Sequence, residues 1–229
     1  RLQGDWSSDV CSSDLAAVVP SAWTQLHRLA GGRFLQEALR ENSGFLWQAL
    51  DVLTRSLCAF HRQAIESGVN LIIVEETGAS HEVMEPALYR DKVLPLLQQQ
   101  LSSTGKVLSV AQFLGRRLYW DDCTLQCSGV GWPIEAGPGF ARGAKRIQGF
   151  AWGGLDPTLW PDASSAWLRG SLRQQLTDLP TTPFILAPPT GISRIRPDQL
   201  EALAFGLRRL PSPERLRETP EEMEARRAA

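Results

Sequence analysis

The sequence predicts an α/β protein whose parallel sheet is an incomplete (β/α)8 barrel with about six of its eight βα units. Six short apolar runs alternate with helix-like segments along the 229 residues, which is the pattern of successive βα units. The segment Gln148–Pro157 ends an apolar run at a Gly-rich turn followed by Leu-Asp-Pro, which is typical of a junction at the active end of a barrel. An open doubly wound sheet is the alternative, but Pro20–Thr24 stands where that fold places a Gly-rich phosphate loop.

The amino-terminal half begins with a short predicted strand, Ala16–Val19, which ends at Pro20. A long helix is predicted over Gly44–Ser67, because apolar residues recur there at helical spacing and Gly68 follows as a stop signal. Those apolar residues are Phe45, Leu46, Ala49, Leu53, Leu57 and Phe60. The next predicted strand, Asn70–Val74, is continuously apolar from Leu71 to Val74, as expected for a parallel strand covered on both faces.

The other elements continue the alternation. Strands are predicted at Lys106–Ala111, Gly129–Trp132, Arg146–Phe150 and Pro183–Ala187. Helices are predicted over Arg33–Arg40, Glu85–Ser103, Arg116–Gln126, Ala163–Thr177 and Pro197–Leu210, with one helical turn at Gly139–Ala144. The barrel is therefore expected to occupy residues 16–210, and the charged stretch 211–229 is expected to be a frayed helix or a disordered tail.

Residues 1–15 read as a foreign leader. The string RLQGDWSSDVCSSDL has no periodicity and joins abruptly to an apolar strand. It resembles a translated sequencing-adapter remnant, and a natural polar tail is the alternative. We exclude it from fold reasoning, as one would a cloning scar.

The composition of the chain limits the kinds of partner and the cellular setting that are expected. The chain is 43% hydrophobic and 21% charged with a net charge of −1, so no nucleic-acid partner is expected. No apolar run approaches the roughly 20 residues of a membrane span, so no membrane partner is expected. Four cysteines are too few for a disulfide framework, and a reduced cytoplasmic setting is expected. Cys123 and Cys127 would share one helix face, where two buried side chains are favoured over a metal site.

Five segments, in order, resemble the uroporphyrinogen decarboxylase superfamily. They are Val18–Gly32, Ala49–Ser80, Met84–Leu97, Arg146–Trp160 and Pro183–Ile192. The resemblance implies a (β/α)8 barrel, and it covers Ala16 to about Leu210. Members include the haem-pathway enzyme, which converts uroporphyrinogen to coproporphyrinogen without metal or cofactor, and methyltransferases that act on cobalamin- or coenzyme-bound methyl groups. The resemblance also implies a possible homodimer.

The functional positions of the family are altered. Where the family has a tyrosine, this chain has His27 and Arg28. Where the family has a serine, it has Glu76 and Thr77, and where the family has a histidine, it reads Pro189-Thr190-Gly191. The zinc-binding His-x-Cys of the methyltransferases has no counterpart in Val107–Phe113, so no metal and no cofactor is expected. The resemblance thus implies a decarboxylase-family protein with altered catalytic positions. The alternatives are a methyltransferase-like relative without zinc and a non-catalytic barrel that binds an anion.

The candidate catalytic residues are Glu75, Glu76 and His81, at or just past the end of the Asn70–Val74 strand. Catalysis in such barrels takes place at the carboxyl ends of strands, and two carboxylates in different environments can divide acid and base roles. Successive residues point to opposite faces, so one glutamate facing the barrel and the other a helix is the alternative.

Further candidates would bind an anionic small-molecule substrate. They are His27, Arg28, Gln148, Arg194 and Arg196. Gln148 is expected inside its strand at the barrel mouth, and the two arginines follow the last strand, where many barrels bind phosphate or carboxylate. Asp156 is interpreted as a helix cap rather than an acid, and His61 as a structural residue on the outer face of the long helix.

Overall fold

The six strands form one parallel sheet in which the spatial order of the strands is their order in the chain. The computed structural model describes residues 15–115, 117–119, 125–133, 140–144, 146–154, 164–168, 183–187 and 196–208. The strands are β1 (Ala16–Pro20), β2 (Leu71–Glu76), β3 (Leu108–Phe113), β4 (Gly129–Trp132), β5 (Phe150–Gly154) and β6 (Phe184–Ala187). A doubly wound sheet reverses its strand order at a switch point, and this sheet does not. The predicted α/β fold with six parallel strands is confirmed, and the sheet is consistent with an incomplete barrel.

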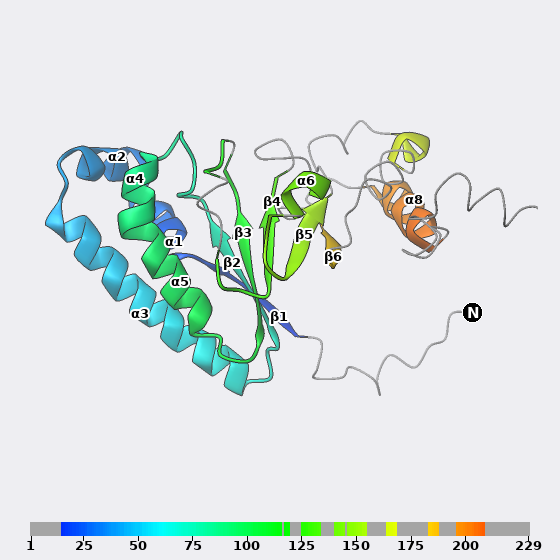
Figure 1. Ribbon diagram of the computed structural model, residues 1–229, viewed down its shortest axis with the longest axis horizontal. Coiled ribbons are helices and arrows are strands. Elements are labelled where there is room, and N and C mark those ends of the chain that lie inside the picture. Colours follow the sequence, from blue (N-terminus) through cyan, green and yellow to red (C-terminus); the bar gives the residue numbers. More distant parts are fainter. Residues whose placement is uncertain are drawn as a thin grey trace, which may run out of the picture.

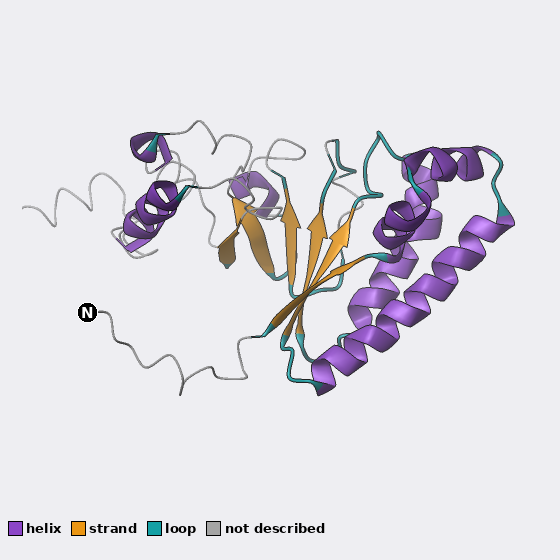
Figure 2. Cartoon of the chain, turned by 180° about the vertical axis from the view of Figure 1, so that it is seen from behind, coloured by secondary structure: helices purple, strands orange, loops and turns teal. Residues whose placement is uncertain are grey.

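The helices of the first half of the chain lie on one side of this sheet (Figure 1, Figure 2). They are α1 (Ala22–Ala30), α2 (Gly32–Arg40), α3 (Gly44–Glu66), α4 (Pro86–Leu88) and α5 (Leu94–Ser102). A π-helical turn, Tyr89–Val93, joins α4 to α5 directly before Pro95, whose ring would clash with the carbonyl four residues earlier in a regular helix. Two further helices are α6 (Phe140–Ala144) and α8 (Pro197–Arg208), and residues 165–168 are also helical.

The pleat assigns the strand residues to two faces. Val19, Val74, Ala111, Val130 and Ala151 share one register row, and all belong to the apolar core that packs against the helices. Because side chains alternate along a strand, the rows on either side of this one face away from the helices. We call that side the inner face.

The inner face is only partly covered. Its side chains Val18, Leu108 and Ile185 are 61%, 51% and 42% exposed. In a closed barrel such residues fill the interior in packed layers, so their exposure marks a sheet that has not closed on itself. None of the helices in the described part of the chain has the length and hydropathy of a membrane span.

Several predicted elements are wrong in extent or type. The strand predicted at Arg146–Phe150 begins only at its last residue, and the preceding residues form a bend. The predicted helix Arg116–Gln126 is not helical at residues 117–119 or 125–126, and Leu118 instead forms an isolated antiparallel bridge with Ser80. The helix α1 was not predicted at all.

The buried side of α3 also differs from the prediction. Phe45 and Phe60 are 66% and 49% exposed, and His61 is fully buried rather than on the outer face. The buried stripe consists of Leu46, Leu50, Thr54, Cys58 and His61. It packs against α5, where His61 Nδ1 lies 3.2 Å from the Gln100 carbonyl oxygen and 3.0 Å from Ser103 Oγ.

Candidate functional site

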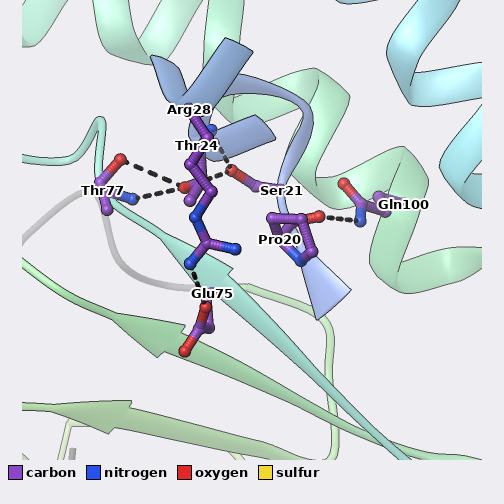
Figure 3. Close-up of polar contacts among 7 residues, drawn as sticks. All are labelled: Pro20, Ser21, Thr24, Arg28, Glu75, Thr77 and Gln100. Carbon is purple, nitrogen blue, oxygen red and sulfur yellow. Dashed lines mark hydrogen bonds and ion pairs between the residues drawn. The ribbon is translucent and has the colours of Figure 1, made fainter. Parts of the chain in front are cut away.

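A cluster of three hydroxyl groups fastens the start of α1 to the carboxyl end of β2 (Figure 3). Ser21 is the N-cap of α1, and its Oγ accepts a hydrogen bond of 3.0 Å from the Thr24 amide. Thr24 Oγ1 in turn accepts a hydrogen bond of 3.0 Å from the Thr77 amide, and the two threonine hydroxyls lie 3.2 Å apart. The cluster of Ser21, Thr24 and Thr77 therefore fixes α1 over the end of the sheet.

Gln100 supports the same junction from α5. Its Nε2 donates to the Pro20 carbonyl at 3.0 Å (Figure 3). Its Oε1 accepts from the Ala22 amide at 3.2 Å. The side chain is completely buried, and its two hydrogen bonds satisfy the amide of the buried Ala22 and the carbonyl of the half-buried Pro20. α5 thus holds the turn between β1 and α1.

Arg28 and Glu75 form an ion pair at this end of the sheet (Figure 3). Arg28 Nη2 lies 2.7 Å from Glu75 Oε2, and the side chains are 52% and 20% exposed. Glu75 belongs to the inner face, in one register row with Pro20 on β1 and Gln112 on β3. The structure thus brings together two predicted site residues, and each neutralises the other.

Glu76 points to the opposite side of the sheet. Its side chain is fully buried toward α1, its Oε1 accepts a hydrogen bond from the Gly78 amide, and its Oε2 has no partner among the described residues. Burial raises the pKa of this carboxyl from 4.5 to about 7, against the lowering effect of the Gly78 and Ser21 hydrogen bonds. Of the two arrangements considered for the glutamates, the structure has the one in which they occupy different faces.

His81 and His27 are both exposed. The His81 ring packs edge-on against Tyr119 with a centroid distance of 4.4 Å, and its amide donates to the Arg117 carbonyl at 3.1 Å. The Tyr119 hydroxyl donates to the Met84 carbonyl. His27 lies in the last turn of α1, beside Arg28 in sequence.

The remaining predicted binding residues lie elsewhere. Gln148 is exposed on the segment before β5, at the amino end of the sheet, rather than inside the strand at its carboxyl end. Arg196 precedes α8, where its Nε donates to Asp198 at 3.1 Å and lowers the pKa of that carboxyl. Arg194 and Asp156 lie outside the described residues.

A polar residue that the sequence analysis missed lies beside Glu75. Gln112 is the last but one residue of β3, as Glu75 is of β2, and it is 2% exposed. Its Nε2 donates to the Phe113 carbonyl at 3.2 Å, whereas its Oε1 is buried and without a partner among the described residues. The sequence signal that could have identified Gln112 is a polar residue directly after the apolar residues Val110 and Ala111.

The residues present do not fit the zinc site that the resemblance would imply. β3 carries Gln112 and Phe113 at its carboxyl end, and neither offers a ligand that zinc prefers. Among the described residues, no group of three His, Cys, Asp or Glu side chains is placed to hold a metal ion. Cys127 precedes β4, its Sγ donates to the Gly129 carbonyl at 3.1 Å, and burial raises the pKa of its thiol; Cys123 lies outside the described residues.

A hollow of about 540 Å³ lies at the other end of the sheet. Its lining consists of Leu15, Ala16, Asn70, Leu71, Lys106, Val107 and Leu108, at the amino ends of β1 to β3. In parallel barrels the reacting groups come from the carboxyl ends of the strands, so this hollow is not the candidate site.

The fold is that of a methyltransferase structure. The chain is similar to a methyltransferase from Methanosarcina mazei, with a TM-score of 0.67 and 20% sequence identity over 83% of this chain. The chain spans 57% of the length of that protein. No protein-family model matches the sequence, and the comparison with curated proteins gives no match.

Proposed function

We propose that this chain is part of a methyltransferase-like barrel enzyme that binds its small-molecule substrate at the carboxyl ends of β2 and β3. The observation that carries the proposal is the likeness to the Methanosarcina mazei methyltransferase structure, in a sheet whose carboxyl end holds the Arg28–Glu75 pair. No step of this proposal is routed through zinc, because Gln112 and Phe113 at the end of β3 are not ligands that zinc prefers.

The two paired residues have complementary roles in this proposal. Arg28 is half-exposed and binds an anionic group of the substrate, for which its guanidinium offers two parallel donors. Glu75 is the proton acceptor on the inner face, 2.7 Å from the Arg28 guanidinium. An anionic substrate has to compete with Glu75 for Arg28, so affinity depends on how the pair rearranges.

Porphyrinogen decarboxylation is a weaker proposal. That reaction needs a site that binds many carboxylates at once, and here the positive charge of Arg28 is already compensated by Glu75. Glu76, which replaces a serine of the family, is buried on the helix side and adds no donor to the inner face.

The experiment is a binding and turnover measurement on the full chain. Isothermal titration with 3-mercaptopropionate, a small anionic thiol, is expected to give a measurable affinity that Arg28→Gln lowers at least about tenfold. Loss of the methylcobalamin absorbance in the presence of the same thiol would report methyl transfer. Uroporphyrinogen, tested in parallel, is expected to be left unchanged.

Arg33→Gln is the matched control. Arg33 also pairs with a glutamate, Glu37 at 3.2 Å, but on the outer surface of α2 with its side chain 93% exposed. Its replacement is expected to leave thiol binding unchanged. Equal affinities of wild type and Arg28→Gln, or decarboxylation of uroporphyrinogen, would overturn the proposal.

A further inference from the structure

Six residues form one register row across the sheet near its carboxyl end. They are Pro20, Glu75, Gln112, Gly131, Trp152 and Ile185. Residues paired in register share one face of a parallel sheet, so all six belong to the inner face. Within this row, the polar residues Glu75 and Gln112 stand on adjacent strands, and Gly131 on β4 separates Gln112 from Trp152 on β5.

Gly131 leaves room that both of its neighbours use. A Cβ at this position would overlap Gln112 Oε1 and lie 2.8 Å from Trp152 Cδ1. The amide of Gln112 therefore extends across β4 toward the pyrrole edge of the Trp152 indole. A side chain on β4 would force the two apart.

The side-chain oxygen of Gln112, Oε1, is a hydrogen-bond acceptor without a donor among the described residues. It is buried, and no described group donates to it, while the amide nitrogen is fixed by the Phe113 carbonyl. Almost all buried polar atoms in folded proteins have a partner, so this oxygen calls for a donor that the described residues do not supply. That group must carry an N–H or O–H, because an amide oxygen only accepts.

The charge of the row limits what that group can be. Glu75 and Arg28 neutralise each other at 2.7 Å, and no other residue of the row is ionisable. Trp152 is half-buried and offers a flat apolar surface beside the oxygen. The row thus suits an uncharged donor on a planar, apolar framework.

We propose that Gln112 contacts the bound small molecule and accepts a hydrogen bond from an uncharged N–H or O–H group on the inner face of the sheet, beside Trp152. The inference rests on the proposed function and names the chemistry of the second end of the substrate. Arg28 binds the anionic end, and Gln112 recognises the donor. A molecule that fills the same space without the donor leaves the buried oxygen unpaired and is rejected.

The test compares two probes on the full chain. 4-Hydroxybenzoate has a carboxylate for Arg28, a planar ring and a hydroxyl donor, whereas 4-methoxybenzoate has the same carboxylate and ring but no donor. Wild type is expected to bind 4-hydroxybenzoate at least about tenfold tighter. Gln112→Met, which keeps the shape and removes the acceptor, is expected to bind the two probes equally.

A second measurement needs no variant. In a ¹H–¹⁵N spectrum, the side-chain amide of Gln112 is expected to shift with 4-hydroxybenzoate and to stay in place with 4-methoxybenzoate. Thermal unfolding separates binding from structure. Gln112→Met removes an unpaired acceptor but also the donor to the Phe113 carbonyl, so its melting temperature is expected to stay close to that of wild type. Gln100→Met, the matched control at a fully paired buried glutamine, is expected to melt lower.

The outcomes distinguish this inference from the proposal on which it rests. If wild type binds both probes equally and Arg28→Gln abolishes binding of both, the result supports Arg28 as the anion-binding residue. The same result contradicts the proposed role of Gln112. If neither probe binds, or if Gln112→Met melts as low as Gln100→Met, Gln112 is a structural residue and the inference is wrong. Failure of the thiol titration would overturn the proposed function on separate grounds.

Discussion

The Arg28 guanidinium and the Glu75 carboxylate lie 2.7 Å apart, which joins the last turn of α1 to the carboxyl end of β2. The pair stands at the end of the sheet where barrel enzymes hold their substrates, and its charges compensate each other. Its strength decides whether Arg28 is available to an incoming anion. The pair therefore regulates the affinity of the proposed site, and its energy can be measured.

The Arg28–Glu75 pair is expected to contribute little to stability. Arg28 is 52% exposed, and solvent-exposed ion pairs contribute at most about 1 kcal/mol. A double-mutant cycle with Arg28→Gln and Glu75→Gln, measured by urea unfolding, should give a coupling energy no larger than this. In the same variants, Glu75→Gln should bind 3-mercaptopropionate more tightly than wild type, since it releases Arg28. Weaker binding by Glu75→Gln would show that Glu75 itself holds the ligand.

Glu76 is expected to make the protein less stable as pH rises. Its pKa is about 7 in the folded chain and near 4.5 when unfolded, so between these values only the folded state keeps the proton. The stabilisation is complete below pH 4.5 and is lost by pH values above 7, a change of about 3 kcal/mol. Glu76→Gln should remove this dependence and unfold at higher urea concentration than wild type at pH 8. An unchanged pH profile in this variant would contradict the assignment.

His61 is expected to act in the opposite direction. Burial lowers its pKa below 6.5, so in acid the unfolded state takes up a proton that the folded state refuses. Its contribution is present above pH 6.5 and is lost as pH falls through the lower folded-state pKa. His61→Asn keeps a donor near the Gln100 carbonyl and does not titrate. Comparison of its urea midpoint with that of wild type from pH 7.5 to 5 should show a smaller loss in the variant.

Gln100 is expected to be among the most sensitive polar positions. Gln100→Met leaves the Ala22 amide and the Pro20 carbonyl without partners in a buried turn, at a cost of about 2–4 kcal/mol. Urea unfolding followed by far-UV circular dichroism measures the loss. Gln99→Met, at an exposed position on the same helix, should change stability far less. Equal losses in the two variants would show that the turn tolerates the unpaired groups.

Gly78 is expected to tolerate no side chain. A Cβ there would lie 2.7 Å from Glu76 Oε1 and 2.9 Å from Trp23 Cδ1, so Gly78→Ala should destabilise by about 1–3 kcal/mol. Gly44, at the start of α3, has open space around its Cβ position. Gly44→Ala should be neutral or stabilising by up to about 1 kcal/mol, because alanine is the better helix former. Thermal melts of the two variants make the comparison.

The sheet was predictable from its apolar runs, but the ends of its strands were not. The predicted strand Asn70–Val74 is apolar from Leu71 to Val74, and this part lies in β2, which nevertheless continues through Glu75 and Glu76. The extension depends on pairing with β1 and β3, where Pro20 and Gln112 meet Glu75 in register. Such pairing is a relation between distant segments, and no local pattern contains it.

The strand β5 was predicted four residues too early in the chain, at Arg146–Phe150 instead of Phe150–Gly154, for a related reason. Its glycines, Gly153 and Gly154, were interpreted as a turn, because glycine weakens isolated strands. In the folded chain β4 supplies Gly129 and Gly131, and the rings of Phe150 and Trp152 occupy the space above them. Glycine and aromatic residues on adjacent strands compensate each other, which only the assembled sheet reveals.

The candidate site was partly predictable. Glu75 and Glu76 drew attention because two charges end an apolar run, and the pleat then decided that they occupy opposite faces. Arg28 was named from a family comparison, yet its partner could be found only in three dimensions. The N-cap signal of Ser21, three residues before Thr24, was available for α1 and went unused.

The strand order has a consequence for how the chain is made. Each strand pairs with its immediate neighbours in the chain, as Val19 pairs with Val74 and Val130 with Ala151. A ribosome therefore delivers every new strand to a sheet edge that already exists, and each step closes a loop no longer than one βα unit. Synthesis that halts after any unit leaves a sheet that lacks its last edge but keeps all of its internal pairing.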